Sequence, residues 1–295
     1  ALTVMEYKEN PVFLDSIYNI EGKKIGYLIY NAFYADNGDG SLSYEKQVNR
    51  VFGKFKEQEI DELIVDLRYN SGGLVTSAID LASMIVSEIN TGTICVSLQY
   101  NSIVTTALRD EYGSDYFDEY FRDKFERTSG KIVLETIPIN NAGVQRVHFI
   151  VSRRTASASE LVINSLNPLM DVVLIGTTTI GKNVGSISIY EKNNPRNTWG
   201  MQPLVLRLTN CLGLADYGNG FEPHIISYDH KNQIKPLGDV SETMLAAALD
   251  NIFGRTVSSS KILADDEFKL IGSSLDLNPS RANMTYSAID LKFIE

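Results

Sequence analysis

The chain has 295 residues, 43% of them apolar and 22% charged, and its formal net charge at pH 7 is −10. This composition is typical of a globular protein with a sizeable core. The acidic balance argues against a nucleic-acid partner, because phosphate binding needs clustered Lys and Arg. No stretch reaches the ~18 apolar residues of a membrane-spanning helix.

Isolated cysteines and histidines give no sign of a cofactor. Cys95 and Cys211 are interpreted as two separate thiols rather than a disulfide. The three histidines lack metal-ligand spacing, so the sequence predicts no metal and no other cofactor.

The first part of the chain alternates strands and helices. Residues 1–20 are interpreted as a lead-in, following either a removed export signal or an upstream domain absent from this sequence. A strand is predicted at residues 22–30. Ser43 is a candidate N-cap for a helix with an apolar stripe of Val48, Val51, Phe52 and Phe55.

A strand, turn and helix follow in direct succession. Residues 62–67 form a short apolar run of the kind found in buried parallel strands. Gly72 and Gly73 form a turn after it, and residues 74–89 are apolar in a helical pattern. Residues 93–98 predict the next strand.

The segment 101–142 is the least regular part and is interpreted as an insertion or a lid. Its aromatic side chains between residues 115 and 125 recur at helical spacing. Such a stripe usually packs in a core or a lid, and the alternative is contact with substrate.

Residues 151–182 predict a strand end, a turn, a helix, a strand and a closing loop. Later strands are predicted at 184–190 and 199–208, and a helix at 241–253 capped by Ser241. Residues 256–295 are interpreted as an extended tail, with edge strands at 269–271 and 289–294. This alternation of strands and helices indicates an α/β domain.

Ser157 and Lys182 are candidate catalytic residues. Ser157 and Glu160 fit the S-x-x-E capping box, so one interpretation makes Ser157 only a helix cap. The other makes it a nucleophile, because free N–H groups at a helix start can stabilise an oxyanion. Lys182, 25 residues later, could serve as its base if burial keeps the amine neutral; otherwise it is a solvated loop lysine.

Four motifs resemble those of peptidase family S41, the carboxyl-terminal processing proteases. They are T-A-S-A-S-E at 155–160, T-I-G-K at 179–182, L-I-V-D-L-R-Y-N-S-G-G at 63–73 and G-N-G-F-E-P at 218–223. The resemblance spans roughly residues 20–255, so it implies a catalytic domain at 21–255. It also implies a ClpP/crotonase-like α/β core with a mixed sheet and flanking helices.

The resemblance implies roles for individual residues. Ser157 and Lys182 match the serine and lysine of the family's catalytic dyad, and the oxyanion hole is expected from backbone N–H groups of Gly72 or Gly73 and Ser157. Some members orient the lysine with a Gln four residues after it, or an Asp eleven after the serine. Those positions hold Ser186 and Pro168 here, so only Ser186 is a possible accessory residue.

The predicted function is serine endopeptidase activity through a Ser-Lys dyad and an acyl-enzyme, on exported proteins near their C-termini. A peptide or protein is the expected partner, and the resemblance suggests a bacterial periplasm or cell envelope. Two alternatives stay open: an inactive peptide-binding protein on the same fold, and another acyl-transfer enzyme of the crotonase-like class. The oligomeric state is not predicted.

Overall fold

The computed structural model describes residues 10–256, except residues 130, 188, 192–193, 195 and 230–233. All but the first residue of the predicted tail, with both of its predicted edge strands, lies outside this range.

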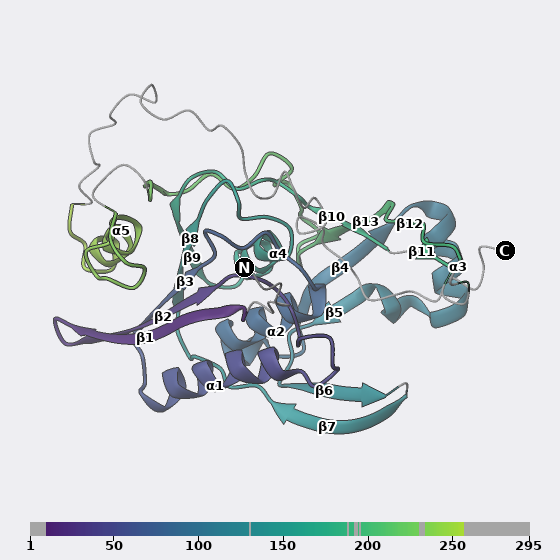
Figure 1. Ribbon diagram of the computed structural model, residues 1–295, viewed down its shortest axis with the longest axis horizontal. Coiled ribbons are helices and arrows are strands. Elements are labelled where there is room, and N and C mark those ends of the chain that lie inside the picture. The colour runs from purple at the N-terminus through teal and green to yellow at the C-terminus, as the bar shows by residue number, and fades with distance from the viewer. Residues whose placement is uncertain are drawn as a thin grey trace, which may run out of the picture.

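A six-stranded mixed sheet forms the centre of the fold, in the order β1-β2-β3-β8-β9-β14 (Figure 1). β1 pairs antiparallel with β2, and the other neighbours pair in parallel. The strands are β1 (Val12–Ile20), β2 (Lys23–Tyr30), β3 (Glu62–Asp66), β8 (Arg146–Val151), β9 (Asp171–Gly176) and β14 (Ile225–Ile226). Much of the stretch assigned to a lead-in is thus an edge strand of the main sheet.

Helices cover both faces of this sheet. α1 (Ser43–Glu57), α2 (Val75–Ile85) and α4 (Ala158–Leu166) share one buried apolar cluster with strand residues. α5 (Thr243–Ile252) closes the opposite face with a second cluster. The predicted stripe of α1 is buried in the first cluster because its residues recur on one helical face.

A second sheet packs against the first helical layer. It is antiparallel in the order β10-β13-β4-β5, and β4 and β13 contribute apolar side chains to the cluster shared with α2 and α4. Its strands are β10 (Val184–Ser186), β13 (Leu204–Thr209), β4 (Ile94–Tyr100) and β5 (Asp118–Tyr120). Part of the helical layer therefore lies between two sheets.

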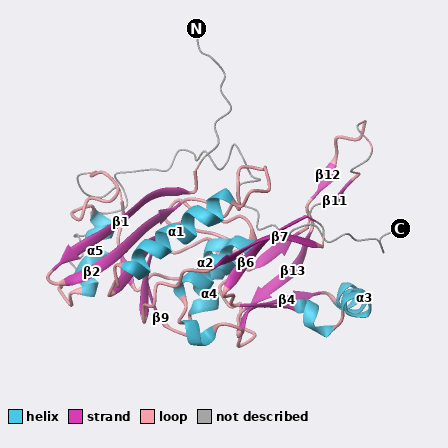
Figure 2. Cartoon of the chain, turned by 90° about the horizontal axis from the view of Figure 1, so that it is seen from below, coloured by secondary structure: helices cyan, strands magenta, loops and turns pink. Residues whose placement is uncertain are grey.

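Smaller elements surround this second sheet. β11 (Ile189–Tyr190) and β12 (Gly200–Met201) form a pair that projects from the end of the molecule carrying α3 (Ser102–Tyr112) (Figure 2). β6 (Lys124–Ser129) and β7 (Ile132–Pro138) form a hairpin. The described residues also include two 3₁₀ turns, at Glu88–Asn90 (η1) and Ser114–Phe117 (η2).

The aromatic residues at 115–125 lie in a 3₁₀ turn, β5, a loop and the start of β6, and Phe121 and Phe125 pack in the core. Two local expectations need correction. Ser43 is the first residue of α1, after Leu42 in the left-handed region at φ 55°. Glu242, not Ser241, caps α5, because its carboxylate accepts from the first N–H groups of that helix.

The fold class is confirmed: a mixed sheet with flanking helices. Cys95 and Cys211 are free thiols, as predicted. Within the described ranges there is no group of His, Cys, Asp and Glu suited to a metal ion. None of the helices there combines the length and apolar character needed to cross a bilayer.

Candidate active site

Three loops follow three neighbouring parallel strands at the same edge of the sheet. Residues 67–73 follow β3, residues 152–157 follow β8, and residues 177–183 follow β9. In open α/β sheets, ligands bind at the carboxyl ends of the strands. The predicted site residues Gly72, Gly73, Ser157 and Lys182 all lie in these loops.

Ser157 occupies a strained turn between β8 and α4. Its backbone has φ 62° and ψ −117°, a conformation that costs a non-glycine residue free energy. The side chain is buried, and Oγ has no hydrogen-bond partner among the described residues. Ser157 and Glu160 are arranged as a capping box, but the hydroxyl forms no hydrogen bond to the α4 backbone.

Glu160 holds the serine turn and the lysine loop together. Its Oε2 accepts the backbone N–H of Ser157 at 2.9 Å and that of Lys182 at 2.8 Å. Its Oε1 accepts the Thr179 hydroxyl at 2.5 Å and the Gly181 N–H at 2.6 Å. Because one buried carboxylate oxygen binds both backbones, the two predicted catalytic residues are neighbours in space.

Lys182 lies in a half-buried position. Burial lowers the pKa of its amine below the ordinary value, and the nearby Glu160 carboxylate partly offsets this effect. A lowered pKa increases the neutral fraction of the amine near neutral pH, which is the form able to accept a proton.

Gly72 and Gly73 bring the first loop against the serine turn. A Cβ on Gly72 would lie 2.7 Å from the Ser157 Cβ, and a Cβ on Gly73 would lie 2.3 Å from the Phe33 carbonyl oxygen. Both glycines have positive φ values, 106° and 142°. Only glycine fits here, because other side chains would clash and strain the backbone.

Asn70 fixes this close approach. Its carbonyl oxygen accepts the Ser159 hydroxyl at 3.0 Å and the Ala156 N–H at 3.3 Å. Its side-chain amide donates to the Tyr30 carbonyl, and its Oδ1 accepts the Gly72 N–H at 2.9 Å. The glycine loop is thereby fastened both to the serine turn and to β2.

Two of the expected oxyanion donors already have acceptors. The Gly72 N–H binds Asn70, and the Ser157 N–H binds Glu160. Gly73 instead forms a parallel bridge with Phe33 in which Phe33 N–H donates to Gly72 and Leu74 N–H donates to Phe33. The Gly73 N–H is not a donor in this bridge, so it is the best placed of the three to meet a ligand.

Ser186 and Pro168 lie in different surroundings. Ser186 is buried at the end of β10, the strand that follows the lysine loop. Pro168 comes just after α4 and lines a cavity of about 280 Å³.

Comparison with known proteins decides the family. The model of peptidase family S41 matches residues 24–202. The chain belongs to peptidase family S41. It is 25% identical over 173 residues to a carboxyl-terminal-processing protease of Picosynechococcus sp., which covers 59% of this chain and 32% of that protein.

A solved structure agrees with this result. A Bacteroides fragilis NCTC 9343 protein assigned to the S41 proteases superposes with a TM-score of 0.72 and 29% identity. The match covers 85% of this chain and 59% of the other. The chain thus spans less than two thirds of either relative. The family supports a serine-type peptidase.

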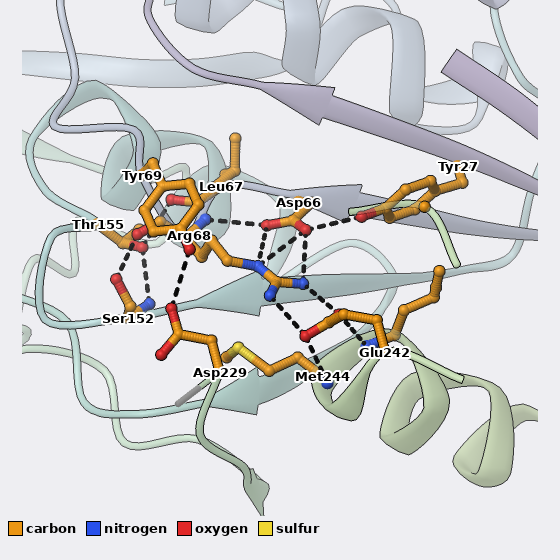
Figure 3. Close-up of polar contacts among 12 residues, drawn as sticks. Tyr27, Asp66, Leu67, Arg68, Tyr69, Ser152, Thr155, Asp229, Glu242 and Met244 are labelled. Carbon is orange, nitrogen blue, oxygen red and sulfur yellow. Dashed lines mark hydrogen bonds and ion pairs between the residues drawn. The ribbon is translucent and has the colours of Figure 1, made fainter. Parts of the chain in front are cut away.

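The S41 chain also contains a buried ionic network that the sequence did not predict (Figure 3). The Arg68 guanidinium donates to both carboxylate oxygens of Glu242 at 2.9 Å and to Asp66 at 2.8–3.0 Å. Tyr27 donates to Asp66 at 2.8 Å. Arg68 therefore joins the end of β3 to the N-terminus of α5, on the other face of the sheet.

The same network reaches the serine turn through backbone groups. The Arg68 carbonyl accepts the Ser152 hydroxyl, and the Leu67 carbonyl accepts the Thr155 hydroxyl at 2.8 Å (Figure 3). Tyr69 donates to Asp229 at 3.0 Å. The loop that carries the glycines is therefore held from several directions.

Sequence reasoning assigned no role to Asn70, Arg68 and Glu242, and treated Glu160 only as a capping partner. For Glu160 the capping box was a usable signal, because it indicated a carboxylate at the helix start. For Arg68 and Glu242 no local signal exists, since 174 residues separate them.

Proposed function

We propose that this chain is a serine endopeptidase whose nucleophile is Ser157 and whose general base is Lys182. The observation that carries the proposal is the buried, unpartnered Ser157 hydroxyl on a strained turn, with Glu160 bound to the backbone of both residues. A buried hydroxyl without a partner costs about 1–3 kcal/mol. Such a cost at a strained position is typical of functional sites.

The reaction follows from these groups. Ser157 Oγ attacks the scissile carbonyl carbon while the neutral Lys182 Nζ takes the hydroxyl proton. The tetrahedral intermediate collapses to an acyl-serine, and the protonated lysine returns a proton to the departing amine. Water, deprotonated by the same lysine, then attacks the acyl-serine and releases the acid product.

The oxyanion is proposed to form beside the glycine loop. The Gly73 N–H is one donor in the structure's present arrangement. The Ser157 and Gly72 N–H groups can join it only if substrate draws them from Glu160 and Asn70. Preorganised donors of this kind contribute about 3–4 kcal/mol to acyl transfer.

The biological setting is part of the proposal. The Picosynechococcus relative is a carboxyl-terminal-processing protease. By this likeness, we place the substrates among exported proteins cleaved near their C-termini, in a bacterial periplasm or envelope.

Labelling with a fluorophosphonate probe tests the proposed chemistry. The probe should modify Ser157 in the unaltered chain and fail to modify Ser157→Ala. Lys182→Ala should label at least 100-fold more slowly because no base activates the hydroxyl. Lys131→Ala, an exposed lysine in the β6–β7 hairpin, serves as the matched control and should label normally. Equal labelling of the Lys182 variant would contradict the dyad.

An inactive peptide-binding protein is the second candidate. It is favoured by the engaged N–H groups of Gly72 and Ser157, which leave the oxyanion hole incomplete without substrate. Unlabelled Ser157 in the folded chain, together with saturable binding of an unstructured protein such as casein, would support this reading.

A further inference from the structure

The loop between β13 and β14 packs directly on the lysine loop. The Asn183 side-chain amide donates to the Ala215 carbonyl at 2.7 Å. A Cβ on Gly181 would lie 2.4 Å from the Gly220 nitrogen and 2.5 Å from the Gly218 oxygen. The position of this loop is therefore tightly coupled to that of Lys182.

Tyr217 is a buried aromatic side chain of this loop. It is 2% exposed, and its ring stacks on Phe221 with centroids 4.8 Å apart and planes 18° apart. Phe221 is in turn bonded to the lysine loop, because its N–H donates to Thr179 Oγ1 at 2.8 Å and its carbonyl accepts the Thr179 N–H at 3.2 Å. The phenol is thus fixed relative to the lysine loop.

The Tyr217 hydroxyl has no hydrogen-bond partner among the residues that the structure describes. Leaving a buried hydroxyl unsatisfied costs free energy, and phenylalanine would fill the same space without that cost. Stability and stacking alone therefore do not explain a tyrosine at this position.

The electrostatic surroundings connect this hydroxyl with the site. Burial raises the pKa of Tyr217, and the Glu160 carboxylate of α4 raises it further, while Arg207 of β13 acts in the opposite direction. Glu160 is also the charged group that acts on the Lys182 amine. The charge of one carboxylate thus acts on the pKa of both the phenol and the lysine.

We propose that Tyr217 is a positioning residue that orients the Lys182 amine in the loaded active site. Its oxygen accepts an N–H of the amine. The lysine lone pair is then directed at the Ser157 hydroxyl. This inference rests on the proposed Ser-Lys chemistry and adds a third polar group to it.

We expect this contact to form when substrate fills the site. Catalytic hydrogen bonds are often long or absent before substrate binds. A merely structural Tyr217 would instead serve as a wall of the cavity of about 280 Å³ that it lines with Asn164 and Asn210. A phenylalanine would serve that purpose equally well.

The test is Tyr217→Phe in the full chain, with the rate of fluorophosphonate labelling of Ser157 measured from pH 6 to pH 10. We expect the plateau rate to fall on the order of 10-fold to 100-fold, as expected when a reacting group is slightly misplaced. The acid limb of the profile, the pH range over which the labelling rate rises to its plateau, should move to lower pH. Loss of an acceptor disfavours the charged amine and lowers the pKa of Lys182 further. The melting temperature should stay equal or rise.

Tyr100→Phe is the matched control. Tyr100 on β4 also has a buried hydroxyl without a partner in the described ranges, but the titratable neighbour acting on it is Tyr116 rather than Glu160. Its variant should keep both the plateau rate and the acid limb of the unaltered chain.

The outcomes separate the two proposals. If Tyr217→Phe labels like the unaltered chain at every pH while Lys182→Ala loses labelling, Tyr217 does not orient the lysine and the dyad stands. If Lys182→Ala labels normally, the dyad itself is wrong, and the positioning role is wrong with it. A slower Tyr217→Phe rate accompanied by an equal loss in Tyr100→Phe would also overturn the role of Tyr217.

Discussion

At the scale of single residues, Glu160 determines the geometry of the candidate site. Four donors from two loops converge on its two oxygens, and the side chain is fully buried. A carboxylate suits this position because it accepts at both oxygens and donates at neither. A residue at a helix-capping position thus joins the backbones of the proposed nucleophile and the proposed base.

Replacing Glu160 with Gln should damage both activity and stability. The amide keeps one accepting oxygen, and its NH₂ group faces N–H donors that it cannot satisfy. We expect labelling of Ser157 to fall at least 10-fold and the free energy of unfolding to drop by about 1–3 kcal/mol. Urea denaturation and probe labelling measure the two effects. Glu57→Gln, on the exposed end of α1, should change neither the labelling rate nor the free energy of unfolding. If Glu160→Gln left both quantities unchanged, the role of Glu160 would be refuted.

Replacing Gly72 with Ala should disturb the position of Ser157. Gly72→Ala would place a methyl carbon 2.7 Å from the Ser157 Cβ at a φ of 106°. The backbone must move to relieve this contact, so Ser157 labelling should fall by 10-fold or more. Gly143→Ala tests strain alone, since Gly143 has φ 71° with open space around its Cα. Equal labelling of both variants would show that the close approach is not needed.

At the scale of elements, α5 is fastened to the main sheet by charge as well as by apolar packing. Glu242 caps the helix and binds the buried Arg68 guanidinium. Burial acts to raise the pKa of Glu242, but its bonds to Arg68 outweigh burial, and the pKa lies below the ordinary value. The ionised form is therefore favoured by folding.

Glu242→Gln should therefore cost about 3–5 kcal/mol in the free energy of unfolding, because a buried guanidinium loses a charged partner. The stabilisation by Glu242 is present above the carboxyl's ordinary pKa of 4.5 and is lost as pH falls through its lowered folded value. The variant should accordingly lose less stability on acidification. Denaturant titrations at pH 3 to pH 7 measure this. Asp239→Asn, in the exposed turn before α5, should change the stability little.

Asp80 of α2, which is affected by Glu45 of α1, predicts a pH dependence of stability opposite to that of Glu242. Burial and the nearby Glu45 raise the pKa of Asp80 to about 8, despite an ion pair with Arg122 at 3.2 Å. A raised carboxyl pKa means that folding disfavours the ionised form, so stability falls as pH rises from about 4 through 8. Thermal melts should show a lower melting temperature at pH 9 than at pH 6. Asp80→Asn should flatten this decline, and an equally steep decline would contradict the assignment.

At the scale of the whole molecule, sequence patterns predicted the elements whose structure depends on residues close together in the chain. The stripe of α1 and the strand–glycine turn–helix unit at 62–85 follow from periodicity and turn chemistry. The candidate site was found because its residues lie in motifs. β1 was missed since its pairing with β2 depends on the sheet as a whole. The aromatic spacing at 115–125 indicated packing, and Phe121 and Phe125 are buried, but it could not give the turn and strands that carry them.

Trp199 provides a probe for the whole molecule. It is the single tryptophan of the sequence and is 84% exposed beside β12. Its emission should resemble that of free tryptophan in the folded chain and be readily quenched by iodide. Global unfolding should hardly shift the emission maximum, in contrast to the far-UV circular dichroism. A strongly blue-shifted emission maximum would show that Trp199 and the β11–β12 pair beside it are covered in solution.

The link between Arg68 and Glu242 has a consequence for biosynthesis. A ribosome releases the arginine 174 residues before the glutamate that neutralises it. Until α5 is present, Arg68 lacks its Glu242 partner, and the loop that carries Gly72 and Gly73 lacks this anchor on the far face of the sheet. That loop is therefore expected to take its final position only after α5 has folded onto the sheet.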